Sequence, residues 1–469
     1  MGFNRVRYRE GEDAIGTRGR WIGPQRGTFW VAGSDDGVHG ELSGPGLDGL
    51  VVDAPLMLLD APTTDAGVVS LTDELEEMVV DLVHGVLHDG TEVTLVGLRR
   101  YTWLLEAFAN GPARQQWEVR AVVTGAHLGS DHIAGIRIIS LETDYSLDWS
   151  QAPGPTLDAS HDVLAAGASQ FGEVRVIGAT EVVHSPQSAT FTRRARIEVE
   201  FNEPVDVEAA VGTIGPNLLS LLGFVVGRPD RVVELRAMVG DLPVPLTIHV
   251  DYLERAGDRD ESRVPARRQV LPVKELPNGI GSLIDEWWRL REEQAGIINL
   301  ISTDRAPFQF LEQRFIAVIQ AAEAAHTQWH GGHDLEPDEF HRRIQDIRDS
   351  NLREEVADWV VRKLGGRNSP SLAERLRHLV WAADLGLPED VVEELVKAKN
   401  LRNPLSHGGT AKIDPEYVYW LTQVWLWIVR REVLIQLGLG AGHASGLVRS
   451  RESFQFALRR MAQVSRASQ

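Results

Sequence analysis

Short apolar runs separated by glycine and proline fill the first half of the chain, a pattern typical of β-strands. The runs Asp81–His88 and Thr91–Val96 flank an Asp-Gly pair, and so do Phe29–Gly33 and Val38–Leu42. Asp-Gly supplies the positive φ that tight turns need, so each pair of runs predicts a β-hairpin, the first with a two-residue loop. Further strands are expected at 117–124, 133–141, 173–177, 194–201, 232–239 and 246–250.

The pattern changes after a charged, proline-spaced stretch at 258–280, which predicts a linker. Beyond the linker the apolar positions recur at helical spacing. Helices are expected at 283–301, 308–328, 337–350, 351–364, 371–383, 388–401, 415–437 and 453–464. We place the N-cap of the 371–383 helix at Ser369, followed by Pro370.

This pattern predicts an α+β multidomain chain. An N-terminal antiparallel β-rich domain, residues 1–257, precedes a C-terminal all-α helical bundle, residues 281–469.

The composition limits the chemistry. The 469 residues include no cysteine, which excludes disulfides, thiolate metal sites and a cysteine nucleophile. No apolar run approaches the ~20 residues that span a bilayer, so we expect no membrane association. Nothing in the chain requires an oxidising compartment, and we expect a cytoplasmic protein.

The net charge of −19 is unevenly distributed. Residues 1–270 carry 23 Lys and Arg against 40 Asp and Glu, whereas residues 271–469 are nearly neutral. An acidic surface repels nucleic acid and anionic lipid. We therefore expect the first half to regulate or sense rather than to bind RNA.

One segment between two predicted helices combines side chains suited to a phosphodiester. Arg402, Asn403 and His407 lie on either side of Pro404. On an unbroken helix Arg402 and His407 would diverge by ~140°. Because proline disfavours helical geometry at the preceding residue, we expect a turn that brings the three side chains to one surface.

The residue types match phosphoryl chemistry. An arginine fork binds phosphate oxygens, a histidine carries protons near neutral pH, and an asparagine orients a hydroxyl or an imidazole. Spacing alone is also compatible with a structural turn in which Arg402 and His407 bond helix-end groups.

The sequence context adds a family resemblance. The Arg-Asn-x-x-x-His-Gly motif between the last two long helices of an all-α domain resembles the HEPN superfamily. Residues 315–326 resemble an early helix of its ApeA-like branch, which belongs to bacterial antiphage defence. In the first half, the segments that resemble the ApeA N-terminal domain are 19–21, 40–42, 85–87, 94–96 and 147–149.

The resemblance implies a toxin-like, metal-independent endoribonuclease that acts by abortive infection and needs no cofactor. Two HEPN domains would pair, as a homodimer or a higher even oligomer, and share a cleft. Arg402 would hold the scissile phosphate, His407 would move protons and Asn403 would orient one of them, leaving 2′,3′-cyclic phosphate and 5′-OH ends. RNA, with tRNA among the candidates, would be the substrate, and an unknown phage-derived trigger would release the restraint imposed by the β domain.

Other residues carry weaker signals. Glu323 is expected to support the site from a neighbouring helix, or only to pair with an arginine. Lys397 and Lys399 would steer RNA, or only complement a helix dipole. His326 and His330, with His333, have a spacing that can hold zinc, but a polar helix end explains them more simply.

Two other functions stay open. One is a non-catalytic HEPN dimerisation module that binds a nucleotide or a partner. The other is a carbohydrate- or protein-binding β domain with a helical oligomerisation tail.

Overall fold

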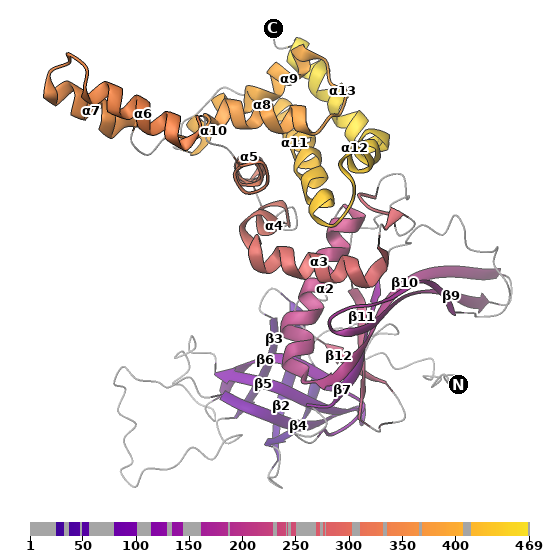
Figure 1. Cartoon of the computed structure of the whole chain (residues 1–469). Coiled ribbons are helices and arrows are strands. Elements are labelled where there is room, and N and C mark those ends of the chain that lie inside the picture. The colour runs from indigo at the N-terminus through magenta and orange to yellow at the C-terminus, as the bar shows by residue number, and fades with distance from the viewer. Residues whose placement is uncertain are drawn as a thin grey trace, which may run out of the picture. The chain divides into compact units, whose positions relative to one another are not determined.

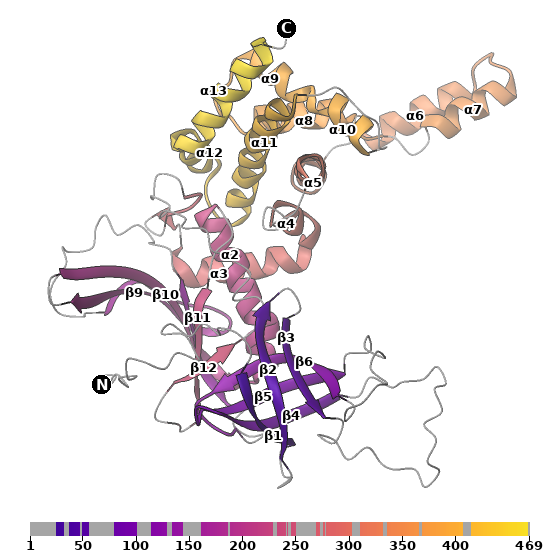
Figure 2. The same cartoon turned by 180° about the vertical axis from the view of Figure 1, so that it is seen from behind.

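A computed structural model of the chain is shown in Figure 1, and Figure 2 gives the opposite view. The residues that the structure describes are 25–31, 37–46, 49–55, 79–100, 114–128, 134–143, 161–185, 188–227, 232–240, 242, 245–249, 269–272, 275–276, 278–302, 310–331, 335–364, 368–406 and 414–467.

In the part that the structure describes, the N-terminal region is antiparallel β-structure with one helical segment. The strands are β1 Gln25–Val31, β2 Val38–Gly46, β3 Gly49–Pro55, β4 Val79–Leu87, β5 Glu92–Arg100, β6 Arg114–Thr124, β7 Ile136–Thr143, β8 His161–Ala168, β9 Gly172–Ser185, β10 Ser188–Val205, β11 Val232–Val239 and β12 Leu246–His249. Between β10 and β11, a π-helix, Ala209–Ile214, leads into α2, Gly215–Val226.

The C-terminal region is helical. Its helices are α3 Gly279–Glu293, α4 Ala295–Ser302, α5 Leu311–Ala325, α6 Pro337–Arg348, α7 Glu354–Leu364, α8 Leu372–Ala382, α9 Glu389–Val396, α10 Ala398–Ser406, α11 Pro415–Gln436, α12 Ala441–Ser450 and α13 Glu452–Ala467. A β-rich region followed by a helical region confirms the predicted fold class.

Six strands close into a barrel, visible at the bottom of Figure 1. The order β3-β2-β1-β4-β5-β6 returns to β3, because β3 pairs with β6 through partners such as Val52 and Trp117. Alternate side chains, including Phe29, Val83 and Leu95, are fully buried. Closure removes the unpaired strand edges that an open sheet would leave at this point.

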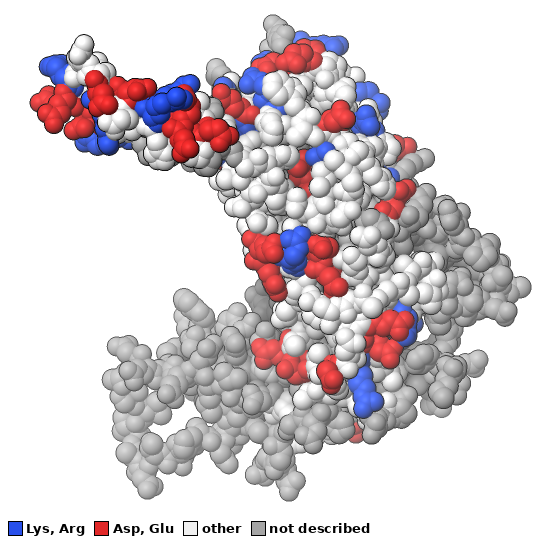
Figure 3. Space-filling model, viewed as in Figure 1, with Lys and Arg blue, Asp and Glu red and all other residues white. Residues whose placement is uncertain are grey.

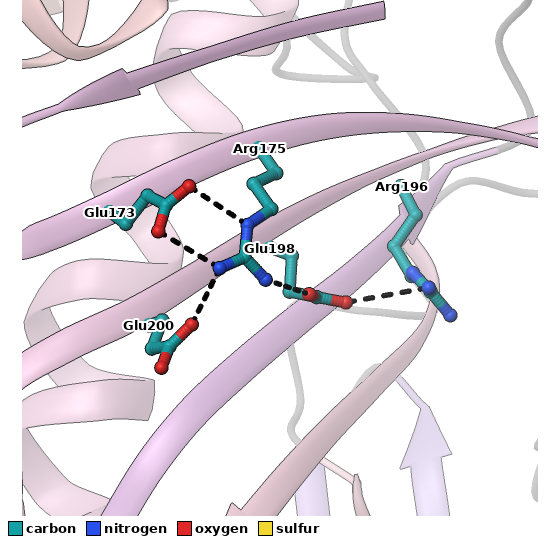
Figure 4. Close-up of polar contacts among 5 residues, drawn as sticks. All are labelled: Glu173, Arg175, Arg196, Glu198 and Glu200. Carbon is teal, nitrogen blue, oxygen red and sulfur yellow. Dashed lines mark hydrogen bonds and ion pairs between the residues drawn. The ribbon is translucent and has the colours of Figure 1, made fainter. Parts of the chain in front are cut away.

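The other six strands continue the sheet from β6 in the order β12-β11-β7-β10-β9-β8. On the long β9–β10 ribbon, Arg175 lies among three carboxylates, at 2.9 Å from Glu173, 3.6 Å from Glu198 and 2.7 Å from Glu200 (Figure 4). Arg196 extends the network to Glu198. The hydrogen bond from Arg175 lowers the pKa of Glu173. This network is partly exposed to solvent, so it offsets like-charge repulsion on the ribbon but adds little to stability.

The hairpin predicted around Asp89-Gly90 is confirmed, with a loop one residue longer than expected. Leu87 N donates to Thr91 O at 2.9 Å, so three residues connect the strands, and Gly90 has a φ of 86°. A three-residue loop places its last residue in the left-handed region, where glycine is favoured. Pairing of Phe29 with Val38 likewise confirms the first predicted hairpin, although residues 32–36 lie outside the described part of the chain.

The π-helix and α2 form an apolar stretch that the sequence analysis overlooked. Ala209–Val226 has the length and hydropathy, 1.7 over 18 residues, of a membrane span. However, 72% of this stretch is buried within the protein, as expected for a core helix.

By packing, the chain divides into two units. The first comprises Met1–Leu222, Asp230–Val264 and Gly279–Ile284, and the second comprises Gly223–Pro229, Pro265–Asn278 and Asp285–Gln469. Within the second unit, the backbone N–H groups of Val270 and Leu271 both donate to Val225 O. Segments before residue 281 therefore complete the helical unit.

In the helical unit, α11 is central. It packs against α4, α5, α12 and α13, and its side chains from Val424 to Leu434 are buried. The α6–α7 hairpin extends away from the other helices of this unit in both views. Acidic and basic side chains are interleaved along its surface (Figure 3). Such mixed charge favours solubility over attraction of a single anionic partner.

Several helix predictions needed revision. The expected helix at 283–301 is interrupted at Gln294, the expected helix at 308–328 changes from α to π winding at His326, and α12 was not predicted. The N-cap of α8 is Ser371 rather than Ser369, since the Ser371 hydroxyl accepts from Glu374 N while Glu374 bonds back to Ser371 N. This reciprocal pairing is a capping box.

Candidate active site

The predicted turn around Pro404 is helical in the structure. Helix α10 runs from Ala398 to Ser406 and includes Arg402, Asn403 and Pro404. Proline lacks only one N–H, and here the helix ends two residues later, so the lost hydrogen bond falls in its last turn. Packing of α10 against α5 and α9 supports the remaining turns.

Arg402 lies beside a carboxylate from another helix. Its Nη2 atom is 3.6 Å from Oε2 of Glu323 on α5. The Oε1 atom of the same carboxylate is 2.6 Å from Nη2 of Arg375 on α8. The three side chains are 29%, 25% and 19% exposed, respectively, so they are partly desolvated yet reachable from solvent.

Immediately after Glu323 the helix changes its winding. α5 continues as a π-helix, His326–His330, and Thr327 Oγ1 donates to Glu323 O at 2.9 Å. Short π-helical turns often occur at functional sites, because they redirect side chains. Here the His326 and His330 rings stack with centroids 5.9 Å apart.

A third imidazole comes from α8. The His378 ring meets those of His326 and His330 edge-on, at 5.0 Å and 5.3 Å. His326 is 4% exposed. Burial, and then the neighbouring His378, His330 and Arg375, lower the pKa of His326 to about 4. His326 is therefore neutral at physiological pH.

The cluster is anchored to the central helix. His330 Nε2 lies 2.8 Å from Glu432 Oε2, and the other oxygen of Glu432 accepts from Arg431 at 2.6 Å. Arg431 also donates to Ser445 on α12. Because Glu432 and Arg431 are almost fully buried, this is a desolvated ion pair, and both oxygens of Glu432 have a partner.

Two known protein families match the sequence that contains these side chains. A family described as ApeA N-terminal domain 1 matches residues 25–287, more than half of the chain, and a family described as Apea-like HEPN matches residues 316–442. The chain belongs to the ApeA-like HEPN family. No curated protein and no solved structure shows significant similarity to the chain.

The ApeA-like HEPN match covers all the residues just described except Ser445. It spans Glu323, the π-helix, Arg375, Arg402 and Glu432, and it ends inside α12. Membership is consistent with a nuclease of antiphage defence, and HEPN domains generally act on RNA and often dimerise.

The structure brings two of the predicted site residues together, Arg402 and Glu323. Asn403 lies on α10, but its side chain is outside the described part, and His407 lies in the segment 407–413, which the structure does not describe. Lys397 Nζ pairs with Glu394 at 2.6 Å and remains 54% exposed. Lys399 is half-buried near Glu374, whose pKa it helps to lower.

Arg375, His378 and Glu432 were not predicted from the sequence. Arg375 and His378 are three residues apart and so share one face of α8. That spacing is common on exposed helices and carries no signal by itself. Only the packing of α8 against α5 and its π-helix brings these side chains to the site.

The zinc alternative gains no support from the described residues. Among them, no group of three or more His, Asp or Glu is arranged to hold a metal ion. His330 instead pairs with Glu432, and His333 lies outside the described residues.

Proposed function

We propose that this ApeA-like HEPN protein is a metal-independent endoribonuclease that acts in antiphage defence by abortive infection. The observation that carries the proposal is Arg402 on α10, a reachable guanidinium beside the Glu323–Arg375 ion pair, within the region that matches the HEPN family. A planar, permanently charged donor of this kind suits a phosphodiester.

The reaction needs only groups of the RNA and of the protein. The 2′-oxygen attacks the adjacent phosphorus as its proton passes to a base, and the bond from phosphorus to the 5′-oxygen breaks as that oxygen gains a proton. A 2′,3′-cyclic phosphate and a 5′-OH result. His407 is the proposed proton carrier, Arg402 stabilises the developing charge and Asn403 orients one of the reacting groups.

The proposed partners follow from the family. Two HEPN domains pair, as a homodimer or a higher even oligomer, and each contributes its Arg402 and His407 to a shared cleft. Lys397 and Lys399 guide the RNA strand, with tRNA as one candidate substrate. The acidic β domain restrains the nuclease until a phage-derived trigger arrives, because an unrestrained ribonuclease would be lethal to the cell. The negative charge of the β domain repels RNA, which fits a regulatory role better than substrate binding.

The test is cleavage of total bacterial RNA by the full-length protein in EDTA, alone and in lysate from phage-infected cells. Arg402→Ala and His407→Ala are compared with Arg377→Ala and His341→Ala, which remove an arginine and a histidine outside the site. Arg377 pairs with Glu393 on α9, and His341 is exposed on α6.

We expect cutting by the wild type and both controls, cyclic phosphate at the 3′ ends, and no cutting by the two site variants. Cutting retained by both site variants would place the active site elsewhere. RNA binding without cutting under either condition would instead support the non-catalytic binding module.

A further inference from the structure

Glu323 is shared between two guanidinium groups that come from different helices. Arg375 reaches it from α8 and Arg402 reaches it from α10. The proposed nuclease chemistry uses Arg402 and does not use Arg375. The geometry of the two contacts indicates what the second arginine does.

The two contacts are unequal. Arg375 Nη2 lies 2.6 Å from Glu323 Oε1, a short charge-assisted contact, whereas Arg402 Nη2 lies 3.6 Å from Oε2, beyond hydrogen-bond range. Arg375 also donates from Nη1 to Thr327 Oγ1 at 3.5 Å, and Thr327 in turn bonds Glu323 O. Arg375 is thus tied to the end of α5 at two points.

A lone carboxylate beside Arg402 would work against RNA binding. It would hold the Arg402 guanidinium in an ion pair and repel the phosphodiester. The penalty would grow in the transition state, where the phosphoryl oxygens gain further negative charge. Arg375 sets a second guanidinium against this one carboxylate, so its positive charge offsets the negative charge that faces Arg402.

We propose that Arg375 is a positioning residue of the nuclease site. It neutralises Glu323 and holds it on α5, so that the charge of Arg402 is available to the scissile phosphate. This inference rests on the proposed function, because it assumes that Arg402 binds RNA phosphate. It predicts that the effect of losing Arg375 depends on the charge of Glu323.

The decisive experiment is a double-mutant cycle on the full-length protein. The variants are Arg375→Ala, Arg375→Lys, Glu323→Gln and the double variant Arg375→Ala/Glu323→Gln. Arg377→Ala is the matched control, because Arg377 is on the same helix and makes a comparable ion pair with Glu393, at 2.8 Å, that does not involve Glu323. The measurements are kcat/KM for RNA cleavage, and affinity for an RNA made uncleavable by 2′-O-methylation at two salt concentrations.

We expect Arg375→Ala to lower kcat/KM by at least about tenfold, and Arg375→Lys to lower it less because the charge is kept. The double variant has the same net charge at the site as the wild type, and we expect it to recover to within about threefold of wild-type kcat/KM. Arg377→Ala should match the wild type. A double variant no more active than Arg375→Ala would overturn the proposal, because a purely structural tie between α5 and α8 cannot be restored by removing its second member.

Glu323→Gln keeps the test valid even where Arg375→Ala lowers the folded fraction. With one negative charge fewer, it should bind the uncleavable RNA several-fold more tightly, with a steeper salt dependence. Unchanged or weaker binding would contradict the charge argument. Should the wild type neither cut nor bind RNA, the proposed function itself fails. Wild-type activity that requires Arg402 but is indifferent to Arg375 rejects only this inference.

Discussion

His330 and Glu432 lie 2.8 Å apart, although 102 positions of the chain separate them. The contact ties the π-helix that follows α5 to the centre of α11. Because Glu432 also accepts from the buried Arg431, one carboxylate holds together the histidine cluster, the central helix and, through Ser445, α12. The backbone that carries Glu323 is thereby supported from the protein core.

Replacing Glu432 by alanine should destabilise the helical unit strongly. The change leaves the Arg431 guanidinium, 4% exposed, without its carboxylate, and an unpaired buried charge costs about 3–5 kcal/mol. Glu416→Ala, on the same helix, is the control, because Glu416 pairs with Arg460 at the surface and should cost less than about 1 kcal/mol. Denaturant unfolding followed by tryptophan fluorescence measures both, and equal losses would contradict the burial argument.

Acid should destabilise the fold through His326. Its pKa is about 4 in the folded protein against 6.5 for a free histidine side chain, because of burial and then His378, His330 and Arg375, partly opposed by Glu432. Between these two values the unfolded chain binds a proton that the folded protein does not, so stability falls as pH drops from 6.5 to 4.

His326→Phe should remove this part of the pH dependence, at most about 3 kcal/mol across the interval. Melting temperatures measured from pH 7.5 to 4.5 provide the comparison. His249→Phe, in the β-rich unit, should flatten the profile by a similar amount, because burial also lowers the pKa of His249 to about 4. A profile unchanged by His326→Phe would show that the imidazole is solvated.

Two helical glycines should respond oppositely to alanine. At Gly281 a Cβ atom would lie 2.0 Å from Ala168 O, a backbone atom that cannot move aside easily. At Gly296 a Cβ atom would have no atom within 4 Å apart from the adjacent residues and the backbone of its own helix. We expect Gly281→Ala to lower the free energy of unfolding by at least about 1–3 kcal/mol, the cost typical of overpacked sites. Gly296→Ala, within α4, should stabilise by about 0.5–1 kcal/mol. Thermal unfolding of the two variants distinguishes them, and a stabilising Gly281→Ala would mean that α3 can shift.

The start of α8 offers a test of the capping assignment. Ser371→Ala removes the side-chain acceptor of the capping box and should cost about 1 kcal/mol. Ser369→Ala, at the position favoured by the sequence pattern, should have no measurable effect. Equilibrium urea unfolding measures this difference in stability. A larger loss for Ser369→Ala than for Ser371→Ala would show that Ser369 is the N-cap.

The strand pattern was predictable where local chemistry is strong. Asp89-Gly90 and the β-prone runs beside it indicate their hairpin, and β11 was predicted with its observed bounds, Val232–Val239. β3, β8 and α2 were missed. For β3 the decisive partner is distant in sequence, because β3 pairs with β6 and closes the barrel.

The candidate site also combines features that could be predicted from the sequence with features that could not. Arg402 and Glu323 could be proposed from residue types and from the family motif, and the structure places them 3.6 Å apart. The helical geometry at Pro404 was not predicted, because proline disfavours it locally and packing of α10 on α5 outweighs that preference. Arg375 resembles any other arginine on an amphipathic helix until its partner is known.

The sequence by itself determined the succession of β-rich and helical regions, the family, and the arginine and glutamate of the site. These properties follow from local periodicity, turn residues and a short motif. Only the tertiary structure decided that the first strands close into a barrel, that Glu323 is shared by two arginines and that Glu432 anchors His330. Such contacts depend on side chains converging from separate helices and strands, and convergence follows from packing of the whole core rather than from any segment alone.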